Sequence, residues 1–280
     1  MTKIITDTAA DITLAQAQAM DITIVPLGIF FGDIAYHQLQ DEKFDLFYKM
    51  LETNEALPVT SQPSPESFLS EFLSAKEQGE DVVVITISGI LSGTIQSATV
   101  AKEISEYENI YIIDSKQAAI GERLLVEWAV RLRGEGKTAR EIAQVLNQMI
   151  PRITLFGTLD TLKYLQKGGR IPKSTALIGS VIGIKPMITL VDGAIVPVGK
   201  ARGHAGARTA MLRLMQESVE IDHTCPVYFG YSDSDTNCAR FHALAAENMD
   251  IGAAQLYPIG GTIGTHVGPG VSAVVFLRKE

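Results

Sequence analysis

Short apolar runs alternate with amphipathic stretches through the first half of the chain. Four apolar runs predict buried strands, at residues 3–6, 22–27, 82–87 and 110–114. Apolar residues recur at helical spacing in four further stretches, near residues 44–53, 66–78, 94–106 and 118–133. Thr138 and Glu141 form a capping-box pattern, which predicts another helix that ends near Met149, before Pro151. This alternation favours a mostly parallel sheet with helices on both faces.

The pattern changes near residue 155. Two apolar runs, 186–191 and 194–198, flank Asp192-Gly193, which suits the tight turn of a hairpin. Helices are expected at 205–217 and 236–248, and strands at 227–231 and near Gln255 and Val274. We therefore predict an α/β fold of two domains. Residues 1–155 would form the parallel sheet flanked by helices, and residues 156–280 an α+β domain with a mixed or antiparallel sheet.

One apolar segment, residues 176–184, contains Gly179 and Gly183 and predicts a buried helix. Residues of this kind could equally line the binding site of an apolar ligand. If the chain holds such a ligand, the two glycines make this segment a candidate gate for its entry and exit.

Composition narrows the function classes. The chain has 280 residues, and 46% of them are hydrophobic, which is typical of a folded protein. Its formal net charge of −8 disfavours binding to nucleic acid. No run reaches the roughly 20 apolar residues of a membrane span, and the first residues do not resemble a signal peptide, so we expect a cytoplasmic protein. The two cysteines and five histidines show no ligand spacing, which predicts that no metal is bound.

Hydroxyl groups and glycines cluster at three points. The strand at 82–87 runs into Ser88-Gly89-Ile90-Leu91-Ser92-Gly93-Thr94, directly before a predicted helix. Thr60-Ser61-Gln62-Pro63-Ser64 precedes another helix, and residues 260–270 contain five glycines and His266. Hydroxyls at a helix amino end suit a carboxylate or a phosphate. The same residues also serve as ordinary caps and turns, so each segment taken alone leaves both interpretations open.

An enzyme remains an alternative on these residues. Ser92, His266 and Asp233 could form the triad of a serine hydrolase that acts on lipid esters. Gly89 lies one position too early for the nucleophile turn of such hydrolases, which weakens this interpretation. Arg170, after Gly168-Gly169, and Arg202 fit either solvent-exposed positions or a binding role.

Six motifs in this order resemble the DegV family over nearly the whole length. They are Thr6-Asp7-Thr8-Ala9-Ala10-Asp11, Thr60-Ser61-Gln62-Pro63-Ser64, Ser88 to Thr94, Asp114-Ser115, Gly168-Gly169-Arg170 and His266-Val267-Gly268-Pro269-Gly270. The chain has Thr6 and Thr8 where the family often has serine, which preserves the hydroxyl groups. The resemblance implies a protein without a cofactor or catalysis of its own, which buries a long-chain fatty acid between two domains. It would present the carboxyl group to a separate fatty acid kinase, which makes acyl phosphate for phospholipid synthesis.

The resemblance also implies residue roles. The fatty acid carboxylate would contact Ser61, Ser92 and His266, with Thr60 and Thr94 close by, and Arg170 and Arg202 would engage the kinase. Each buried methylene of the tail contributes about 0.8 kcal/mol, and neutral donors would leave a carboxylate oxygen available for attack on phosphorus. Uptake or release of a buried tail implies a transient contact with a membrane or a partner. A lipid-sensing regulatory protein is a further alternative.

Overall fold

The computed structural model describes residues 2–172, 183–218 and 220–279. The first half contains a four-stranded sheet of order β2-β1-β6-β7 in which all neighbours are parallel. Its strands are β1 (Thr2–Asp7), β2 (Thr23–Val25), β6 (Asp81–Thr86) and β7 (Ile110–Asp114). The predicted parallel sheet and its four strands are confirmed.

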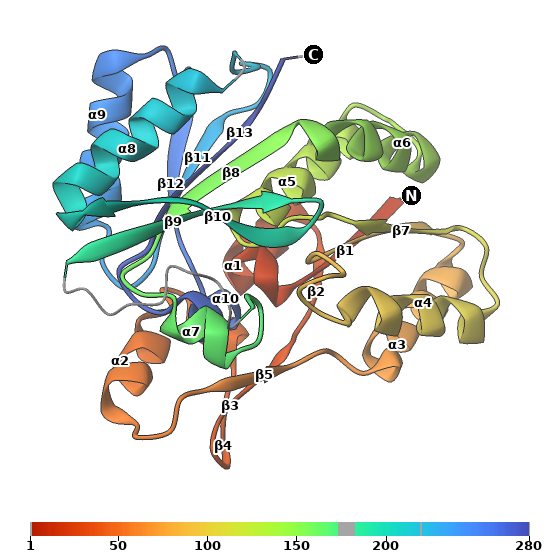
Figure 1. The fold of residues 1–280 in the computed structure, drawn as a ribbon. Helices are drawn as coiled ribbons and strands as arrows, with labels where there is room; N and C mark the ends of the chain where they lie inside the picture. Colours follow the sequence, from red (N-terminus) through yellow and green to blue (C-terminus); the bar gives the residue numbers. More distant parts are fainter. Residues whose placement is uncertain (1, 173–182, 219, 280) are drawn as a thin grey trace.

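Helices cover both faces of this sheet because successive strand residues point to opposite sides. Ile4 packs with the helices α5 and α6, whereas its neighbour Ile5 packs with α3 and α4. Figure 1 shows the two helix pairs on either side of the strands. The bounds are α3 (Pro65–Gln78), α4 (Thr94–Ser105), α5 (Ile120–Gly134) and α6 (Ala139–Met149). The capping box of α6, between Thr138 and Glu141, forms as predicted.

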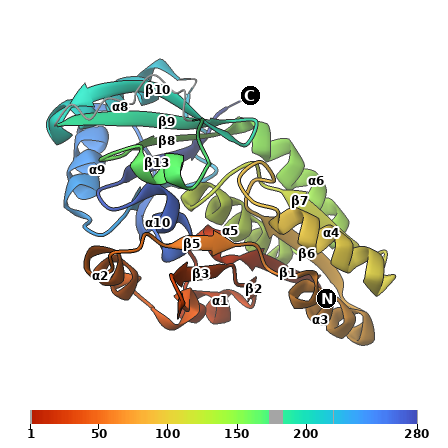
Figure 2. The ribbon, with the colours of Figure 1, turned by 60° about the horizontal axis from the view of Figure 1, so that its bottom comes forward.

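The second sheet has six strands of order β10-β9-β8-β13-β11-β12 and mixes parallel and antiparallel pairs. Its strands are β8 (Ile153–Thr158), β9 (Ile184–Val191), β10 (Ala194–Arg202), β11 (Val227–Tyr231), β12 (Ala254–Pro258) and β13 (Ser272–Leu277). The predicted hairpin is β9-β10, and α8 (Gly203–Glu217) and α9 (Thr236–Asn248) pack on one face (Figure 2). Because β8 belongs to this sheet, a two-domain division near residue 155 falls within that strand.

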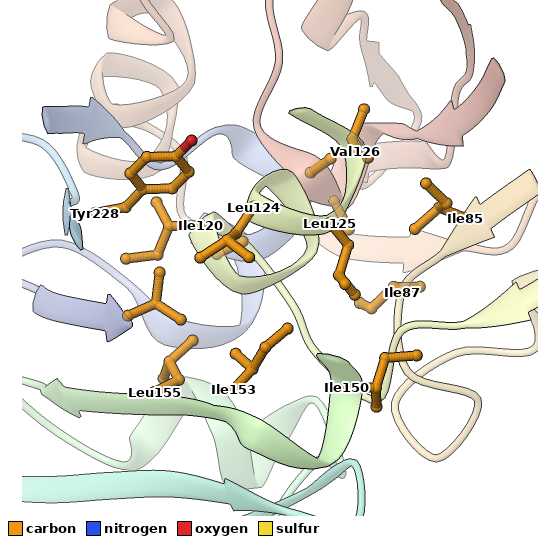
Figure 3. Close-up of a cluster of buried hydrophobic side chains, with 14 of the residues drawn as sticks. Ile85, Ile87, Ile120, Leu124, Leu125, Val126, Ile150, Ile153, Leu155 and Tyr228 are labelled. Carbon is orange, nitrogen blue, oxygen red and sulfur yellow. The ribbon is translucent and has the colours of Figure 1, made fainter. Parts of the chain in front are cut away.

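Helix α5 packs between the two sheets, so both halves share one hydrophobic core. Figure 3 shows Ile120 of α5 on the side of Tyr228 in β11, and Leu125 toward Ile87 after β6. Each of these four side chains is at most 6% exposed. The core that joins the halves is therefore continuous.

A third, small sheet was not predicted. It has the order β4-β3-β5, with strands β3 (Gly28–Phe31), β4 (Ile34–Tyr36) and β5 (Val59–Ser61). The helix α2 (Asp45–Thr53) packs on its inner face through Phe47 and Tyr48. The remaining short helices are α1 (Leu14–Met20), α7 (Lys163–Lys167), η1 (Thr8–Ala10), η2 (Gln38–Gln40) and η3 (Ile150–Arg152).

The glycine-rich segment at 260–270 contains a helix, α10 (Gly261–Val267). Two of its glycines permit close packing on the aromatic rings of the small sheet and α2. A Cβ on Gly261 would lie 2.6 Å from the Phe47 ring, and one on Gly264 would lie 2.7 Å from it. Gly261 and Gly264 therefore serve a close approach between elements rather than a turn.

Part of one prediction lies outside the described residues. Of the apolar segment at 176–184, only Gly183 and Ile184 are described, and Ile184 begins β9. Within the described ranges, no helix has the length and apolar character needed to cross a bilayer.

Candidate ligand pocket

A small cavity of about 60 Å³ lies where the two halves of the chain meet. Its polar lining residues come from four segments that are distant in sequence: Thr60 on β5, Ser92 before α4, Arg170 after α7, and Thr262 and His266 on α10. The remaining lining is apolar: Leu27, Ile87, Leu91, Ala118, Leu165, Ile195, Ile263 and Val267. The cavity thus combines polar groups with a wall suited to hydrocarbon.

Thr60 and His266 form the central polar contact of this pocket. Thr60 Oγ1 lies 2.8 Å from His266 Nε2. Thr60 pairs with the buried Ile29 in β3, so its side chain lies on the inner face of the small sheet. Ser61 follows it on the opposite, exposed face, where its Oγ would lie 2.5 Å from a Cβ on Gly28. Strand alternation therefore brings Thr60 into the pocket and directs Ser61 away from it.

The loop between β6 and α4 supplies two hydroxyl groups. Ser92 Oγ and Thr94 Oγ1 lie 2.9 Å apart, and Thr94 is fully buried at the start of α4. The same loop anchors the β9-β10 hairpin, because Ser88 Oγ donates to the carbonyl of Gly193 at 2.8 Å. This anchor places Ile195 of β10 against the pocket.

Arg170 connects two walls of the pocket. Its Nε donates to the carbonyl of Leu91 at 3.0 Å, and its Nη1 donates to the carbonyl of Gly168 at 2.6 Å. Burial lowers the pKa of Arg170, although a guanidinium remains charged near neutral pH. Arg202, the other predicted arginine, is exposed at the end of β10 and does not line the pocket.

His266 is uncharged near neutral pH. Burial, with a smaller contribution from the nearby positive charge of Arg170, lowers its pKa to about 4. Its second ring nitrogen, Nδ1, is buried and has no hydrogen-bond partner among the described residues.

Polar residues from the first half hold the amino end of α10. Asp11 Oδ1 accepts a hydrogen bond from Gly260 N at 2.8 Å, and Gln38 Oε1 accepts one from Thr262 N at 2.7 Å. Gln38 Nε2 in turn donates to the carbonyl of Thr8 at 2.7 Å. Sequence reasoning did not identify Thr262 or Gln38 as site residues. Thr262 lies in the glycine-rich segment at 260–270. No neighbouring residues mark Gln38 as a site residue, because its role depends on a contact with Thr262, 224 positions away.

The hydrogen bonds do not assemble the triad of the alternative enzyme interpretation. His266 Nε2 contacts Thr60, and Ser92 Oγ contacts Thr94. Asp233 lines a different cavity with Tyr48 and Tyr231. Across residues 2–172, 183–218 and 220–279, no group of three or more His, Cys, Asp or Glu side chains is arranged to hold a metal ion.

Comparison with known proteins identifies relatives over the whole chain. The family model described as an uncharacterised protein of the DegV family matches residues 1–279. A DegV domain-containing protein of Caldanaerobacter subterraneus is 30% identical over 276 residues, which cover 99% of this chain and 98% of the relative.

Solved structures agree with this match. A stearic acid-binding protein from Eubacterium ventriosum is 30% identical with a TM-score of 0.89, over 100% of this chain and 99% of that one. A fatty acid-binding DegV family protein from Thermus thermophilus is 28% identical with a TM-score of 0.87, over 99% of both chains. On the full-length family match and these full-length relatives, the chain belongs to the DegV family.

Proposed function

We propose that this protein binds a long-chain fatty acid, with the carboxylate near Thr60, Ser92, Thr94 and His266. The observation that carries the proposal is a mostly apolar cavity that Thr60, Ser92 and His266 line with two hydroxyl groups and a neutral imidazole, with Thr94 bonded to Ser92. The stearic acid-binding and fatty acid-binding relatives support the same ligand class.

The polar groups suit a single negative charge. Arg170 lines the cavity, but its Nε and Nη1 each donate to a backbone carbonyl, whereas Thr60 and Ser92 line it with neutral hydroxyl groups. A carboxylate can exchange its hydration for such donors, whereas a phosphate dianion favours direct contacts with cations. The tail then supplies most of the affinity, at about 0.8 kcal/mol for each buried methylene.

The pocket must widen to admit the tail. A volume of about 60 Å³ has room for only a few water molecules. Side chains on separate elements, such as Leu27, Ile195 and Ile263, would move apart as the chain enters. We infer that binding couples to a rearrangement at the junction of the two halves.

The finer proposal concerns what happens to the bound carboxylate. A separate cytoplasmic fatty acid kinase would bring ATP to it. A carboxylate oxygen attacks the γ-phosphorus, the bond from that phosphorus to the bridging oxygen breaks, and ADP leaves with the electron pair. Because neutral donors compete weakly for the oxygen's lone pairs, the carboxylate remains nucleophilic. We propose Arg202, which is exposed, and Arg170, which lines the pocket, as contacts with the kinase. Loading and release would involve transient contact with a membrane.

Native mass spectrometry of the purified protein tests the ligand. We expect an added mass that disappears after denaturation and solvent extraction and that matches one or more fatty acids in the extract. Stripped protein should also bind added palmitate or oleate. A protein that carries no lipid and takes up neither acid would contradict the proposal.

A pair of serine variants tests the position of the head group. Ser92→Ala should weaken palmitate binding about tenfold, because it removes a donor to a charged group. Ser61→Ala is the matched control and should bind like the unaltered protein, since Ser61 lies on the outer face of β5. Equal losses in both variants would place the carboxylate elsewhere. Ester hydrolysis that vanishes in Ser92→Ala would instead favour a hydrolase.

A further inference from the structure

The direction of one hydrogen bond decides what the pocket offers to a ligand. Thr60 Oγ1 and His266 Nε2 lie 2.8 Å apart, and a hydroxyl can share this bond with a neutral imidazole in two ways. Thr60 can donate its single hydrogen to the ring. Alternatively, the ring donates and the Thr60 hydrogen remains free for another acceptor.

The surroundings of Nδ1 distinguish these two arrangements. Nδ1 is buried without a hydrogen-bond partner among the described residues, and it lies against Gly168, where a Cβ would be only 2.3 Å away. If Thr60 donated to Nε2, the only ring proton would lie on Nδ1 as a buried N–H without an acceptor. Orphaned buried N–H groups are rare, whereas acceptors with an unused lone pair are tolerated more often. The proton is therefore better placed on Nε2.

A doubly protonated His266 ring is unfavourable for two reasons. Like the Nδ1 tautomer, it would carry an unpaired buried N–H at Nδ1, and it would place a buried positive charge near Arg170. Burial and Arg170 together lower the pKa of His266 to about 4, so the ring is neutral near pH 7.

We propose that His266 is a positioning residue whose ring, protonated on Nε2, donates to Thr60 Oγ1 and so directs the Thr60 hydroxyl hydrogen toward the ligand. This inference rests on the proposed function and identifies Thr60 as a hydrogen-bond donor to the fatty acid carboxylate. Ser92 and Thr94 share one hydrogen bond, which uses one of their two hydroxyl hydrogens and leaves the other to donate. The site then suits an acceptor without a hydrogen of its own, which is the ionised carboxylate rather than an alcohol.

Nitrogen NMR of the full-length protein with labelled histidine tests the tautomer directly in the unaltered protein. At pH 7 we expect the attached hydrogen on Nε2 of His266 and none on Nδ1, in both the stripped and the palmitate-loaded protein. His266→Gln identifies the signal among the five histidines. A hydrogen on Nδ1, alone or together with one on Nε2, would overturn the proposal.

A double-mutant cycle tests whether His266 acts through Thr60. Thr60→Val and His266→Leu should each weaken palmitate binding about tenfold, and the double variant should be no weaker than Thr60→Val alone. If both side chains contacted the carboxylate independently, the two losses would multiply to about a hundredfold and the positioning role would be wrong. Thr60→Ser keeps the hydroxyl and should bind normally. His266→Gln, whose amide N–H can donate to Thr60, should recover most of the affinity lost in His266→Leu.

The outcomes separate this inference from the proposed function. A protein that binds no fatty acid contradicts the proposed function, whatever the tautomer. A protein that binds palmitate while carrying the hydrogen on Nδ1 contradicts only the positioning role of His266.

Discussion

At the scale of single residues, the pocket depends on how closely Gly168 approaches His266. Gly168 has an ordinary helical φ of −72°, so its backbone would accept alanine, but its Cβ would lie 2.3 Å from His266 Nδ1. The next residue, Gly169, has a φ of +72° and open space where a Cβ would be. The first glycine is therefore required by packing, and the second by backbone conformation.

Alanine substitutions separate these two requirements. Gly168→Ala should displace the His266 ring and weaken palmitate binding about tenfold. Gly169→Ala should cost about 1 kcal/mol of stability through backbone strain and leave binding nearly unchanged. Palmitate titration and urea unfolding of both variants provide the comparison. Normal binding by Gly168→Ala would show that the position of the ring does not matter.

At the scale of elements, α10 is held by partners from the other half of the chain. The helix has seven residues, which is too short to be stable alone. The N–H of its N-cap, Gly260, donates to Asp11, and the N–H of Thr262 in its first turn donates to Gln38. Thr262 Oγ1 adds bonds to Thr8 Oγ1 at 2.9 Å and to Gln38 Oε1 at 2.8 Å. Gln38 is thus the common partner of α10 and η1, and it fixes the helix that carries His266.

Removal of the Gln38 amide should loosen α10. Gln38→Ala leaves the Thr262 N–H buried without its acceptor and removes one of the two hydrogen bonds to the Thr8 carbonyl, at a cost of about 2 kcal/mol in the free energy of unfolding. Palmitate affinity should fall as well, because α10 carries His266. Gln78→Ala, at an exposed position on α3, is the control and should change neither property. If the Gln38 variant binds palmitate with full affinity, α10 does not need this connection.

At the scale of the whole molecule, three carboxyl groups are buried where the halves meet. Asp7 accepts hydrogen bonds from the backbone N–H groups of Ala9 and Ile87, and Glu122 accepts one from Thr6 Oγ1. Burial raises the pKa of Asp7 to about 6 and raises those of Asp11 and Glu122 well above their ordinary values. Asp11 Oδ2 and Glu122 Oε2 have no partner among the described residues.

These shifts predict that stability falls as the pH rises. A carboxyl group whose pKa is raised by folding binds more protons in the folded state, so the free energy of unfolding decreases as pH increases above the unfolded pKa. For Asp7 this decrease lies between about pH 4 and 6. For Glu122 it begins near the ordinary value of 4.5 and continues to higher pH.

Glu122→Gln imitates the protonated carboxyl group and tests this sign. The variant should be more stable than the unaltered protein at pH 8, and the advantage should shrink toward pH 5, as measured by urea unfolding at both values. Exposed Glu77→Gln is the control and should leave the pH dependence unchanged. A Glu122→Gln variant that is destabilised more at pH 8 than at pH 5 would contradict the assignment.

Local chemistry in the sequence determined most of the elements and the outline of the fold. The β7 strand, the α9 helix and the β9-β10 hairpin follow from apolar periodicity and turn residues, which act over a few positions. The parallel sheet follows from the alternation of strands and helices. The sequence pattern also identified the hydroxyl-rich loop before α4.

The tertiary structure alone decided how the site is assembled. The small β4-β3-β5 sheet has strands of only three or four residues, too short for a periodic signal. Its pairing turns Thr60 inward and Ser61 outward, a one-residue distinction that two neighbouring hydroxyl residues cannot reveal in sequence. The contact of Thr60 with His266 joins positions 206 residues apart. Such contacts depend on packing between elements, whereas the sequence pattern reports the folding preferences of each element by itself.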